Sequence, residues 1–500
     1  MIRYLRAALA MALMSAQLAH ASDSDRPDLV LVGEVTGKDS QSYRNIPFNV
    51  PEGTTRVTVQ FDYDGAADHT VIDLGLLGPG GFKAQDGFRG WSGGTKHVLT
   101  VSATDATPSY LPGAIQAGRW ELLLGIPNAR SDSKTPFNVN VWFGRAGDPA
   151  WKPAVLNPPL RKGLAWYRGD LHMHTAHSDG QCSSQSGKRV SCPVFLTVMA
   201  AAARKLDFIA ITDHNTLSQV NTMRELQPYF DQLLLMPGSE ITTFSGHANV
   251  IGLNAPLDFR VGTSNVPDWN TVARAASSQQ AVLSINHAIR PTGEMCMGCA
   301  WTAQPDINMQ NVQAIEIVNG GDAGTEMSGI PFWDQQLNAG YRITGIAGSD
   351  NHNAVTPAWQ SDAVGRPTTV VQANALSTPD ILDGVRAGHV FVDVEGTANR
   401  SLAVTAHQGS NQAAMGDTLI APVASNVTFE VRATHSKGGR FVAVLDGKPM
   451  PMLNHGQLPS DDASTRFDWT SDGKPHWLRI EVHGADNSPL LYGNPVYLNR

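Results

Sequence analysis

The sequence predicts a central α/β domain with an all-β domain on each side of it along the chain. Three observations support this fold class. Residues 28–147 and 396–500 contain short runs of alternating apolar and polar residues, separated by Gly, Pro and Asp. Residues 165–395 instead contain short apolar runs that alternate with helix-like segments. A chain of 500 residues is also too long for one compact domain, since domains usually contain about 100–200 residues.

The first β domain is expected over residues 28–147. Thr55–Phe61 and Asn138–Phe143 alternate with a period of two, as strands with one buried face do. Turn-forming residues separate such runs in the manner of an antiparallel β-sandwich. A Pro-rich stretch over residues 148–164 then predicts a linker. A second, smaller β domain is expected over residues 396–500.

The central domain is expected over residues 165–395. Phe208–Ile211 and Ala314–Val318 are apolar runs of strand length, and helix-like segments such as Trp269–Gln280 lie between runs of this kind. Strands that are each followed by a helix indicate a parallel sheet. In such sheets the functional residues collect at the carboxyl ends of the strands.

The first 21 residues predict a signal peptide. Arg3 and Arg6 precede a short apolar stretch, and Ala19–Ala21 has the small-x-small pattern of a cleavage site. This apolar stretch is too short to cross a bilayer, which requires about 20 residues. We therefore expect a periplasmic or secreted protein without membrane insertion. A buried N-terminal helix is the alternative interpretation.

The charge balance disfavours a nucleic-acid partner. The chain has 37 Lys and Arg against 45 Asp and Glu, a formal net charge of -8, and no basic block. Proteins that bind nucleic acid through phosphate contacts usually carry a basic surface. The expected partner is a small-molecule substrate, and the sequence leaves the oligomeric state open.

The chain has four cysteines, Cys182, Cys192, Cys296 and Cys299. In an oxidising compartment they favour two disulfides, for which three pairings exist. Pairing of sequence neighbours, Cys182 with Cys192 and Cys296 with Cys299, would close two loops. A four-thiolate zinc site is the alternative, although only the second pair has Cys-x-x-Cys spacing.

Residue types that bind metals follow the ends of successive apolar runs in the central domain. His172 and His174 share one face of an extended segment, and Asp179 lies in the loop that follows. The further members are His214, Glu240, His247, His287, Asp350 and His352. Imidazole and carboxylate ligands suit zinc, manganese or iron. Because there are too many candidates for one tetrahedral site, we expect two or three divalent ions, with Glu240 able to bridge two of them.

Such ions polarise an ester oxygen and generate hydroxide near neutral pH. The expected reaction is attack of a metal-bridging hydroxide on an ester, after which a nearby His or Asp protonates the leaving group. Three side chains are catalytic candidates: His177 as an outer acid, Asp213 as a carboxylate that orients a ligand, and Arg290 as an anion clamp. The respective structural alternatives are an exposed loop residue, a cap at a strand end and a surface arginine.

Several motifs resemble those of a known family. Gly169–Thr175 with Ser178–Gly180 resembles motif I of the PHP (polymerase and histidinol phosphatase) superfamily. Ile211–Asn215 resembles motif II, and Gly348–His352 resembles the last motif. With the N-terminal sandwich and Ser245–Gly252, the chain looks most like the CehA/McbA (carbaryl-hydrolase-like) branch.

The resemblance implies a distorted (β/α)7 barrel with a metal cluster at the carboxyl end of its strands. It distributes the ligands over three ions. The first would be held by His172, His174, Glu240 and Asp350, the second by Asp179, His214 and His352, and the third by His287 with Glu240. Many relatives carry a further ligand His where this chain has Asn249, and His247 on the same strand face is the expected substitute.

Two substrate classes follow from the resemblance. A phosphoester suits the superfamily and is favoured, whereas a carbamate or an aryl carboxylic ester suits the branch. An aryl group would be favoured if apolar side chains lined the pocket, although these could equally belong to the core. They are Met295, Met297, Trp301, Met327 and Trp333. A hypothesis of another class is a non-catalytic protein that binds glycan or another surface through its β domains.

Overall fold

A computed structural model describes the chain over residues 25–294, 296–302, 307–452 and 456–500. The expected signal peptide, residues 1–21, lies outside the described residues. No helix in the described part of the chain is long and apolar enough to cross a membrane. The chain forms two compact units. Of the described residues, the first contains 25–103, Ser109–Arg145 and Lys152–Asn157, and the second contains Thr104–Pro108, Ala146–Trp151 and those from Pro158 to Arg500.

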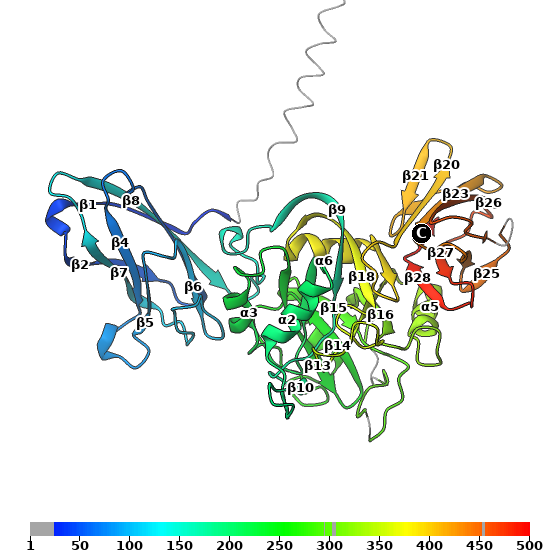
Figure 1. Ribbon diagram of the computed structural model, residues 1–500, viewed down its shortest axis with the longest axis horizontal. Coiled ribbons are helices and arrows are strands. Elements are labelled where there is room, and N and C mark those ends of the chain that lie inside the picture. Colours follow the sequence, from blue (N-terminus) through cyan, green and yellow to red (C-terminus); the bar gives the residue numbers. More distant parts are fainter. Residues whose placement is uncertain (1–24, 295, 303–306, 453–455) are drawn as a thin grey trace, which may run out of the picture. The chain divides into compact units, whose positions relative to one another are not determined.

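The first unit contains two antiparallel four-stranded sheets (Figure 1). Its strands are β1 (Leu29–Thr36), β2 (Ser42–Val50), β3 (Thr54–Tyr63), β4 (Val71–Leu77), β5 (Phe88–Gly93), β6 (Val98–Ser102), β7 (Gly118–Asn128) and β8 (Lys134–Arg145). One sheet has the order β1-β8-β3-β6 and the other β2-β7-β4-β5. In β7, Trp120, Leu122 and Leu124 are buried while the residues between them are partly exposed. The period of two in the sequence therefore corresponds to sheets with one apolar face.

The second unit contains the α/β part of the chain. Its strands are β9 (Arg161–Asp170), β12 (Phe208–Ile211), β13 (Leu234–Thr243), β14 (Gly246–Ile251), β15 (Val282–Ile285), β16 (Ala314–Asn319), β17 (Thr344–Gly348), β18 (Thr368–Leu376) and β19 (Val390–Asp393), with a small hairpin of β10 (Gln181–Ser183) and β11 (Arg189–Ser191). Its helices are α2 (Val194–Ala203), α3 (Val220–Leu226), α4 (Trp269–Ser278), α5 (Ile330–Asn338) and α6 (Thr378–Ala387). Neighbouring strands pair in the order β17-β16-β15-β14-β13-β12-β9-β18-β19.

The expected (β/α)7 barrel is not confirmed, because the sheet is mixed. The pairs β9–β12, β12–β13, β15–β16 and β16–β17 are parallel. In contrast, β14 is antiparallel to both β13 and β15, and β13 leads into β14 through a turn at Phe244 and Ser245 without a helix between them. The segments after β9 and β17 are joined by a parallel bridge between Met173 and Asn351.

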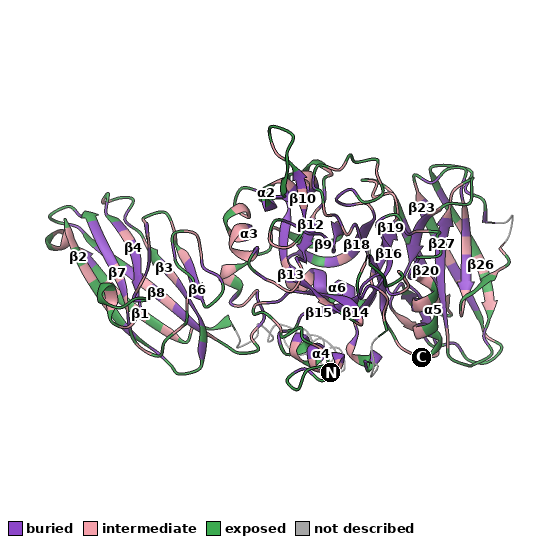
Figure 2. Cartoon of the chain, turned by 90° about the horizontal axis from the view of Figure 1, so that it is seen from below, coloured by how far each residue is buried: buried purple, intermediate pink, exposed green. Residues whose placement is uncertain are grey.

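Burial explains why the central strands are continuous apolar runs. All four residues of β12 and all four of β15 are buried (Figure 2), as is usual for strands that are covered on both faces. Helix α4 contributes Trp269, Val272 and Ala276 to the core. The Asp268 side chain caps this helix by accepting a hydrogen bond from the Thr271 backbone N–H at 2.9 Å.

Residues from 396 onward form further β-strands, some of which continue the large sheet. The strands are β20 (Ser401–Gln408), β21 (Asn411–Ala414), β22 (Thr418–Leu419), β23 (Asn426–Thr434), β24 (Arg440–Leu445), β25 (Lys448–Met450), β26 (Asp462–Thr470), β27 (His476–His483), β28 (Pro489–Gly493) and β29 (Val496–Leu498). Strand β28 pairs antiparallel with β19. A separate sheet, β21-β20-β23-β26, shares a buried core with β24, β27 and β28. The C-terminal strands therefore form one compact unit with the α/β part.

A buried arginine connects the C-terminal strands to α5. Arg479 in β27 is 2% exposed and forms ion pairs with Asp334 of α5 and with Glu481, whose Oε1 lies 2.8 Å from Nη2. Its guanidinium also lies 5.2 Å from the ring centres of Trp333 and Trp477. A buried cation of this kind is tolerated only because carboxylates surround it.

We predict that Arg479→Ala strongly destabilises the second unit. Removing one member of a buried ion pair leaves the remaining carboxylates uncompensated, which costs about 3–5 kcal/mol of unfolding free energy. Denaturant titration followed by tryptophan fluorescence measures the change. The matched control is Arg432→Ala, which removes an exposed pair with Asp462 and should leave the transition midpoint unchanged. Equal effects of the two substitutions would contradict the prediction.

Candidate metal centre

The strand ends of the second unit bring all nine expected metal ligands into one region. His172 and His174 follow β9, His214 follows β12, Glu240 lies in β13, His247 lies in β14, His287 follows β15, and Asp350 and His352 follow β17; only Asp179 lies in a longer loop. Backbone hydrogen bonds join the segments after β9 and β17. The Asp350 N–H donates to the His172 carbonyl at 2.9 Å, and the His174 N–H donates to the Asn351 carbonyl at 2.8 Å.

The first ligand group is formed by His172, His174 and Asp350, joined by Glu240. Asp350 Oδ1 lies 3.3 Å from His172 Nε2 and 3.2 Å from His174 Nε2. Glu240 Oε2 lies 3.4 Å from each of these nitrogens. Four ligands about 2.1 Å from a tetrahedral ion are about 3.4 Å apart. The separations between each carboxylate and the two imidazoles therefore match the spacing of metal ligands.

The second ligand group contains His174, Asp179, His214 and His352. Asp179 Oδ1 lies 3.5 Å from His214 Nε2 and 3.3 Å from His352 Nε2. The side chains of Asp179 and His352 are 56% and 39% exposed, whereas His172 and His174 are almost completely buried. The second group is therefore the side of the centre that solvent reaches.

The third ligand group contains His247, His287 and Cys299, all buried. Glu240 Oε1 lies 3.3 Å from His247 Nδ1 and 3.4 Å from His287 Nε2. Asn249, the other residue considered for this group, instead donates from Nδ2 to the Leu171 carbonyl at 3.1 Å. Sequence reasoning missed Cys299, because its Cys-x-x-Cys spacing indicated a disulfide and gave no sign of the neighbouring histidines.

Hydrogen bonds fix which ring nitrogen of several histidines is free. His172 Nδ1 lies 2.9 Å from Glu316 Oε1, and His352 Nδ1 lies 2.8 Å from the Asp350 carbonyl. The Asp350 carbonyl can only accept, so His352 Nδ1 donates, and the Glu316 carboxylate oxygen is the acceptor for His172 Nδ1; each Nε2 then keeps its lone pair for a metal. His247 Nε2 likewise donates to the Met297 carbonyl at 3.2 Å, which leaves Nδ1 free.

Unpaired buried nitrogens show that this donor set fits bound metal ions. In the described part of the chain, His172 Nε2, both ring nitrogens of His174 and His287 Nδ1 are buried without a hydrogen-bond partner. Buried polar atoms normally have such a partner. Because an imidazole nitrogen that coordinates a metal makes no other bond, metal ligation explains the unpaired ring nitrogens that face the carboxylates.

The carboxylates and imidazoles of the centre shift one another's pKa values. Burial acts to raise the pKa of Glu240, but His172, His214 and His247 outweigh it and hold that pKa well below its usual range. Burial acts to lower the pKa of His214, but Asp179 and Glu240 outweigh it and raise that pKa to about 10. Without metal, a proton on His214 therefore offsets part of the carboxylate charge.

Glu316 and Asp170 support the ligands from outside the three groups. Glu316 accepts from His172 through Oε1, and through Oε2 from the His287 backbone N–H at 3.1 Å and Asn319 Nδ2 at 2.9 Å. Asp170 accepts from the Ser349 N–H at 3.0 Å and thereby holds the segment that precedes Asp350. Both carboxylates are buried, so they act on the geometry of the ligands.

The three catalytic candidates occupy different surroundings. Asp213 is buried. Its carboxylate accepts hydrogen bonds from the Thr175 backbone N–H, from Thr175 Oγ1 and from Ser178 Oγ, at 2.6–2.7 Å. It therefore anchors the loop that carries Asp179. His177 is partly exposed, with Nδ1 2.7 Å from Ser218 Oγ.

The Arg290 guanidinium binds two carboxylates and one side-chain amide oxygen. Its Nη1 lies 3.2 Å from Asp350 Oδ2, and its Nη2 lies 2.9 Å from Asp322 Oδ2 and 2.5 Å from Asn319 Oδ1. The guanidinium therefore positions the Asp350 carboxylate from the side opposite the histidines. Its role as an anion clamp stays a prediction, as do the catalytic roles of His177 and Asp213.

The cysteines confirm one of the two expected disulfides. Cys296 and Cys299 are bonded, whereas the expected bond between Cys182 and Cys192 is wrong, because both are free, buried thiols. Burial and a hydrogen bond with Cys182 raise the pKa of Cys192 to about 12. Within the described residues no ligand group combines the two pairs, so the four-thiolate alternative finds no support there.

Comparison with known proteins gives weak likenesses. No family model and no curated protein matches the chain. A two-domain protein from Bacteroides vulgatus, described as containing a predicted PHP-like metal-dependent phosphoesterase, is 20% identical over 67% of this chain and 96% of its own, with a TM-score of 0.37. PliG, a periplasmic inhibitor of g-type lysozyme from Salmonella Typhimurium, is 16% identical over 24% of this chain and 91% of its own, with a TM-score of 0.14. With TM-scores this low, we infer the function from the site itself.

We predict that Glu316→Gln weakens metal binding about 10–100-fold, the usual effect of losing a partner that orients a ligand. Glu316 accepts hydrogen bonds at both oxygens, and an amide would turn an N–H toward one of those donors. Competition with a chelator, followed by metal analysis, measures the change. Glu52→Gln, at an exposed position of the first unit, is the control. Equal metal retention by both variants would show that Glu316 does not orient the ligands.

We also predict that metal binding releases protons and strengthens as pH rises. Ligand imidazoles must be neutral, but in the metal-free chain His214 has a pKa of about 10 and is protonated at neutral pH. Apparent affinity should therefore keep rising well above the ordinary imidazole pKa of about 6.5. Calorimetric titration in buffers of different ionisation enthalpy counts the protons. An affinity that stops rising near pH 7 would contradict the expectation.

Proposed function

We propose that this protein is an exported, metal-dependent hydrolase that cleaves phosphoester bonds of small molecules. The observation that carries the proposal is the position of the Glu240 carboxylate. Its Oε2 faces His172 and His174, and its Oε1 faces His247 and His287. A carboxylate shared by two ligand groups allows two cations to act on one substrate.

Two or three divalent ions, such as zinc, manganese or iron, would polarise the ester oxygen and lower the pKa of bound water. The chain's own residues hold and orient the reactants. Asp179, His214 and His352 form the exposed side of the centre, so the substrate would approach from there. The several ligand groups offer separate positions for the oxygens of a phosphoryl group, which favours a phosphoester.

His177 is our candidate for protonating the leaving group. It lies two residues from Asp179, is partly exposed, and has Nδ1 held by Ser218, which leaves Nε2 free to carry a proton. Asp213 would fix the position of this loop through Thr175 and Ser178. Arg290 would supply positive charge beside Asp350.

A carbamate or aryl carboxylic ester is the second candidate substrate. It is favoured by exposed apolar side chains near the third ligand group: Met297 is 73% exposed, and its carbonyl accepts from His247. Phe244 is 96% exposed, at the turn between β13 and β14. In contrast, Trp333 is completely buried, Trp301 is only partly exposed, and Met295 lies outside the described residues.

We further propose that the chain is a member of the PHP superfamily and of its CehA/McbA branch. The support is the set of motifs around His172, His214 and Asp350, whose side chains meet in one centre. A periplasmic or secreted location is supported by the disulfide between Cys296 and Cys299, since disulfides persist in oxidising compartments.

The test is hydrolysis by the purified chain, with its metal content measured beforehand. The substrates are bis-(p-nitrophenyl) phosphate, p-nitrophenyl phosphate and 1-naphthyl N-methylcarbamate, each tested before chelation, after chelation and after metal is restored. We expect at least two ions per chain and phosphoester turnover that depends on metal. His172→Ala should abolish this turnover, because the imidazole that faces both Asp350 and Glu240 is lost.

His97→Ala, at an exposed position of the first unit, is the matched control and should keep full activity. Preferential cleavage of the carbamate would replace the phosphoester with the second candidate. Absence of turnover on all three substrates by metal-loaded protein would instead favour a protein that binds glycan or another surface.

A further inference from the structure

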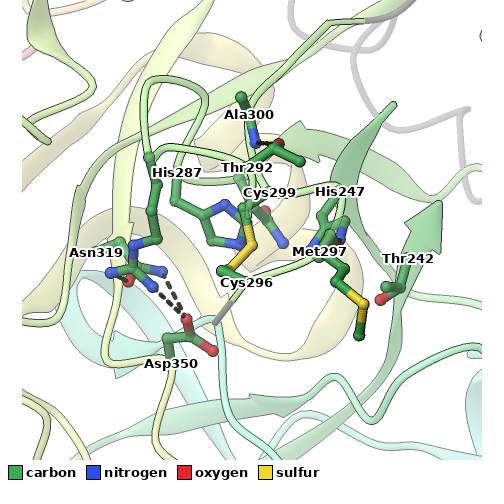
Figure 3. The surroundings of a disulfide bond; sticks show 12 residues. Thr242, His247, His287, Thr292, Cys296, Met297, Cys299, Ala300, Asn319 and Asp350 are labelled. Atoms are coloured by element: carbon green, nitrogen blue, oxygen red, sulfur yellow. Dashed lines mark hydrogen bonds and ion pairs between the residues drawn. A yellow bond between two sulfur atoms is a disulfide. The ribbon is translucent and has the colours of Figure 1, made fainter. Parts of the chain in front are cut away.

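The third ligand group contains a sulfur atom that is held in a disulfide. His247, His287 and Cys299 each offer one ligand atom, and these atoms lie within 4.8 Å of one another. Cys299 is completely buried and is bonded to Cys296 (Figure 3). Figure 3 shows the two histidines beside this disulfide. The sulfur atom that could bind a metal is therefore the same atom that the disulfide makes unavailable.

We propose that the disulfide between Cys296 and Cys299 is a redox gate on the third metal site. In the oxidised chain, His247 Nδ1, His287 and Glu240 Oε1 provide three ligands and leave a position open. In the reduced chain, Cys299 Sγ would join His247 and His287, whose ligand atoms lie within 4.8 Å of it, while Glu240 Oε1 faces the same two imidazoles. Three protein ligands are typical of an open, reactive zinc site and four of a closed one.

The two cysteines differ in how far they are exposed to solvent, and a redox gate requires that a reductant can reach one of them. Cys296 is partly exposed and is followed by Met297, which is 73% exposed, whereas Cys299 is completely buried. A dithiol reductant can therefore reach Cys296. Its thiolate forms a bond to Cys296 Sγ, the bond between the two cysteines breaks, and Cys299 leaves as a thiolate beside the histidines. The second thiol of the reductant then displaces Cys296 and becomes part of the oxidised, cyclic reductant.

Backbone contacts other than the disulfide also hold this loop. Gly293 and Cys296 exchange backbone hydrogen bonds of 3.0 and 3.2 Å, and the Trp301 N–H donates to the Ala288 carbonyl at 2.9 Å. Gly298 has φ +77°, and a Cβ there would lie 2.1 Å from the Thr243 carbonyl. The backbone beside Cys299 is therefore held closely against the end of β13, so reduction frees the sulfur without moving it away from the histidines.

The partners of His247 connect the same loop to the site. His247 Nε2 donates to the Met297 carbonyl, within the disulfide loop, while Nδ1 faces Glu240 Oε1. His287 Nδ1 is buried without a hydrogen-bond partner among the described residues. The third group therefore offers one imidazole oriented by the disulfide loop, a second imidazole and one sulfur, ligand types that suit zinc or cobalt.

The test uses cobalt, because a thiolate bound to Co²⁺ gives a charge-transfer absorption band in the near ultraviolet. The full chain, freed of metal by chelation, is loaded with Co²⁺ either oxidised or after treatment with a phosphine reductant. We expect the band in the reduced protein and its loss in the oxidised protein. Cys296→Ser should show the band without any reductant, because Cys299 can then form no bond to residue 296.

Two controls identify the sulfur. Cys299→Ser should lack the band under all conditions, and the double variant Cys182→Ser with Cys192→Ser should keep it after reduction, which excludes the other buried thiols. A band that survives in Cys299→Ser, or its absence from both the reduced chain and Cys296→Ser, would overturn the proposal. Metal analysis separates this failure from that of the proposed function: two bound ions without a thiolate band would reject only the gate.

Discussion

The candidate metal centre depends on the contacts between the Glu240 carboxylate and the histidines around it. Glu240 is 1% exposed, with Oε2 facing His172, His174 and His214 and Oε1 facing His247 and His287. A buried carboxylate costs several kcal/mol unless positive charge compensates it. In the metal-free chain that charge is provided by protons, as the raised pKa values of His172 and His214 indicate. Bound cations would replace those protons, so the charge of the centre stays balanced in either state.

The two-sided position of Glu240 follows from the pairing of β13. The first half of this strand is parallel to β12, up to the pair of Ile211 with Pro237, and the second half is antiparallel to β14 from Gly238 onward. Glu240 therefore lies just past the end of β12, where its N–H donates to the Thr212 carbonyl at 2.9 Å. Because β13 stops pairing with β12 here, one side of β13 faces the segment that follows β12. The other side stays paired with β14, beyond which lies β15. The mixed sheet is thus what allows one carboxylate to serve two ligand groups.

Local chemistry in the sequence was sufficient to predict which side chains lie together in the candidate centre. Alternation over a few residues placed His172 and His174 on one face, and apolar runs located the strand ends that carry His214, His287 and Asp350. Roles that depend on neighbours from other strands could not be foreseen. Asp213 was expected to orient a metal ligand, yet its oxygens accept hydrogen bonds from Thr175 and Ser178.

The sequence by itself therefore determined the residue types, the strand ends and the presence of a cluster, because these depend on contacts between near neighbours in the chain. The tertiary structure decided how the cluster is divided: which oxygen of Glu240 faces which histidines, that Arg290 binds Asp350, and that Cys299 lies beside His247 and His287. It also decided that Cys182 and Cys192 remain thiols and that the sheet is mixed. These features depend on packing between segments far apart in the chain, which local patterns do not encode.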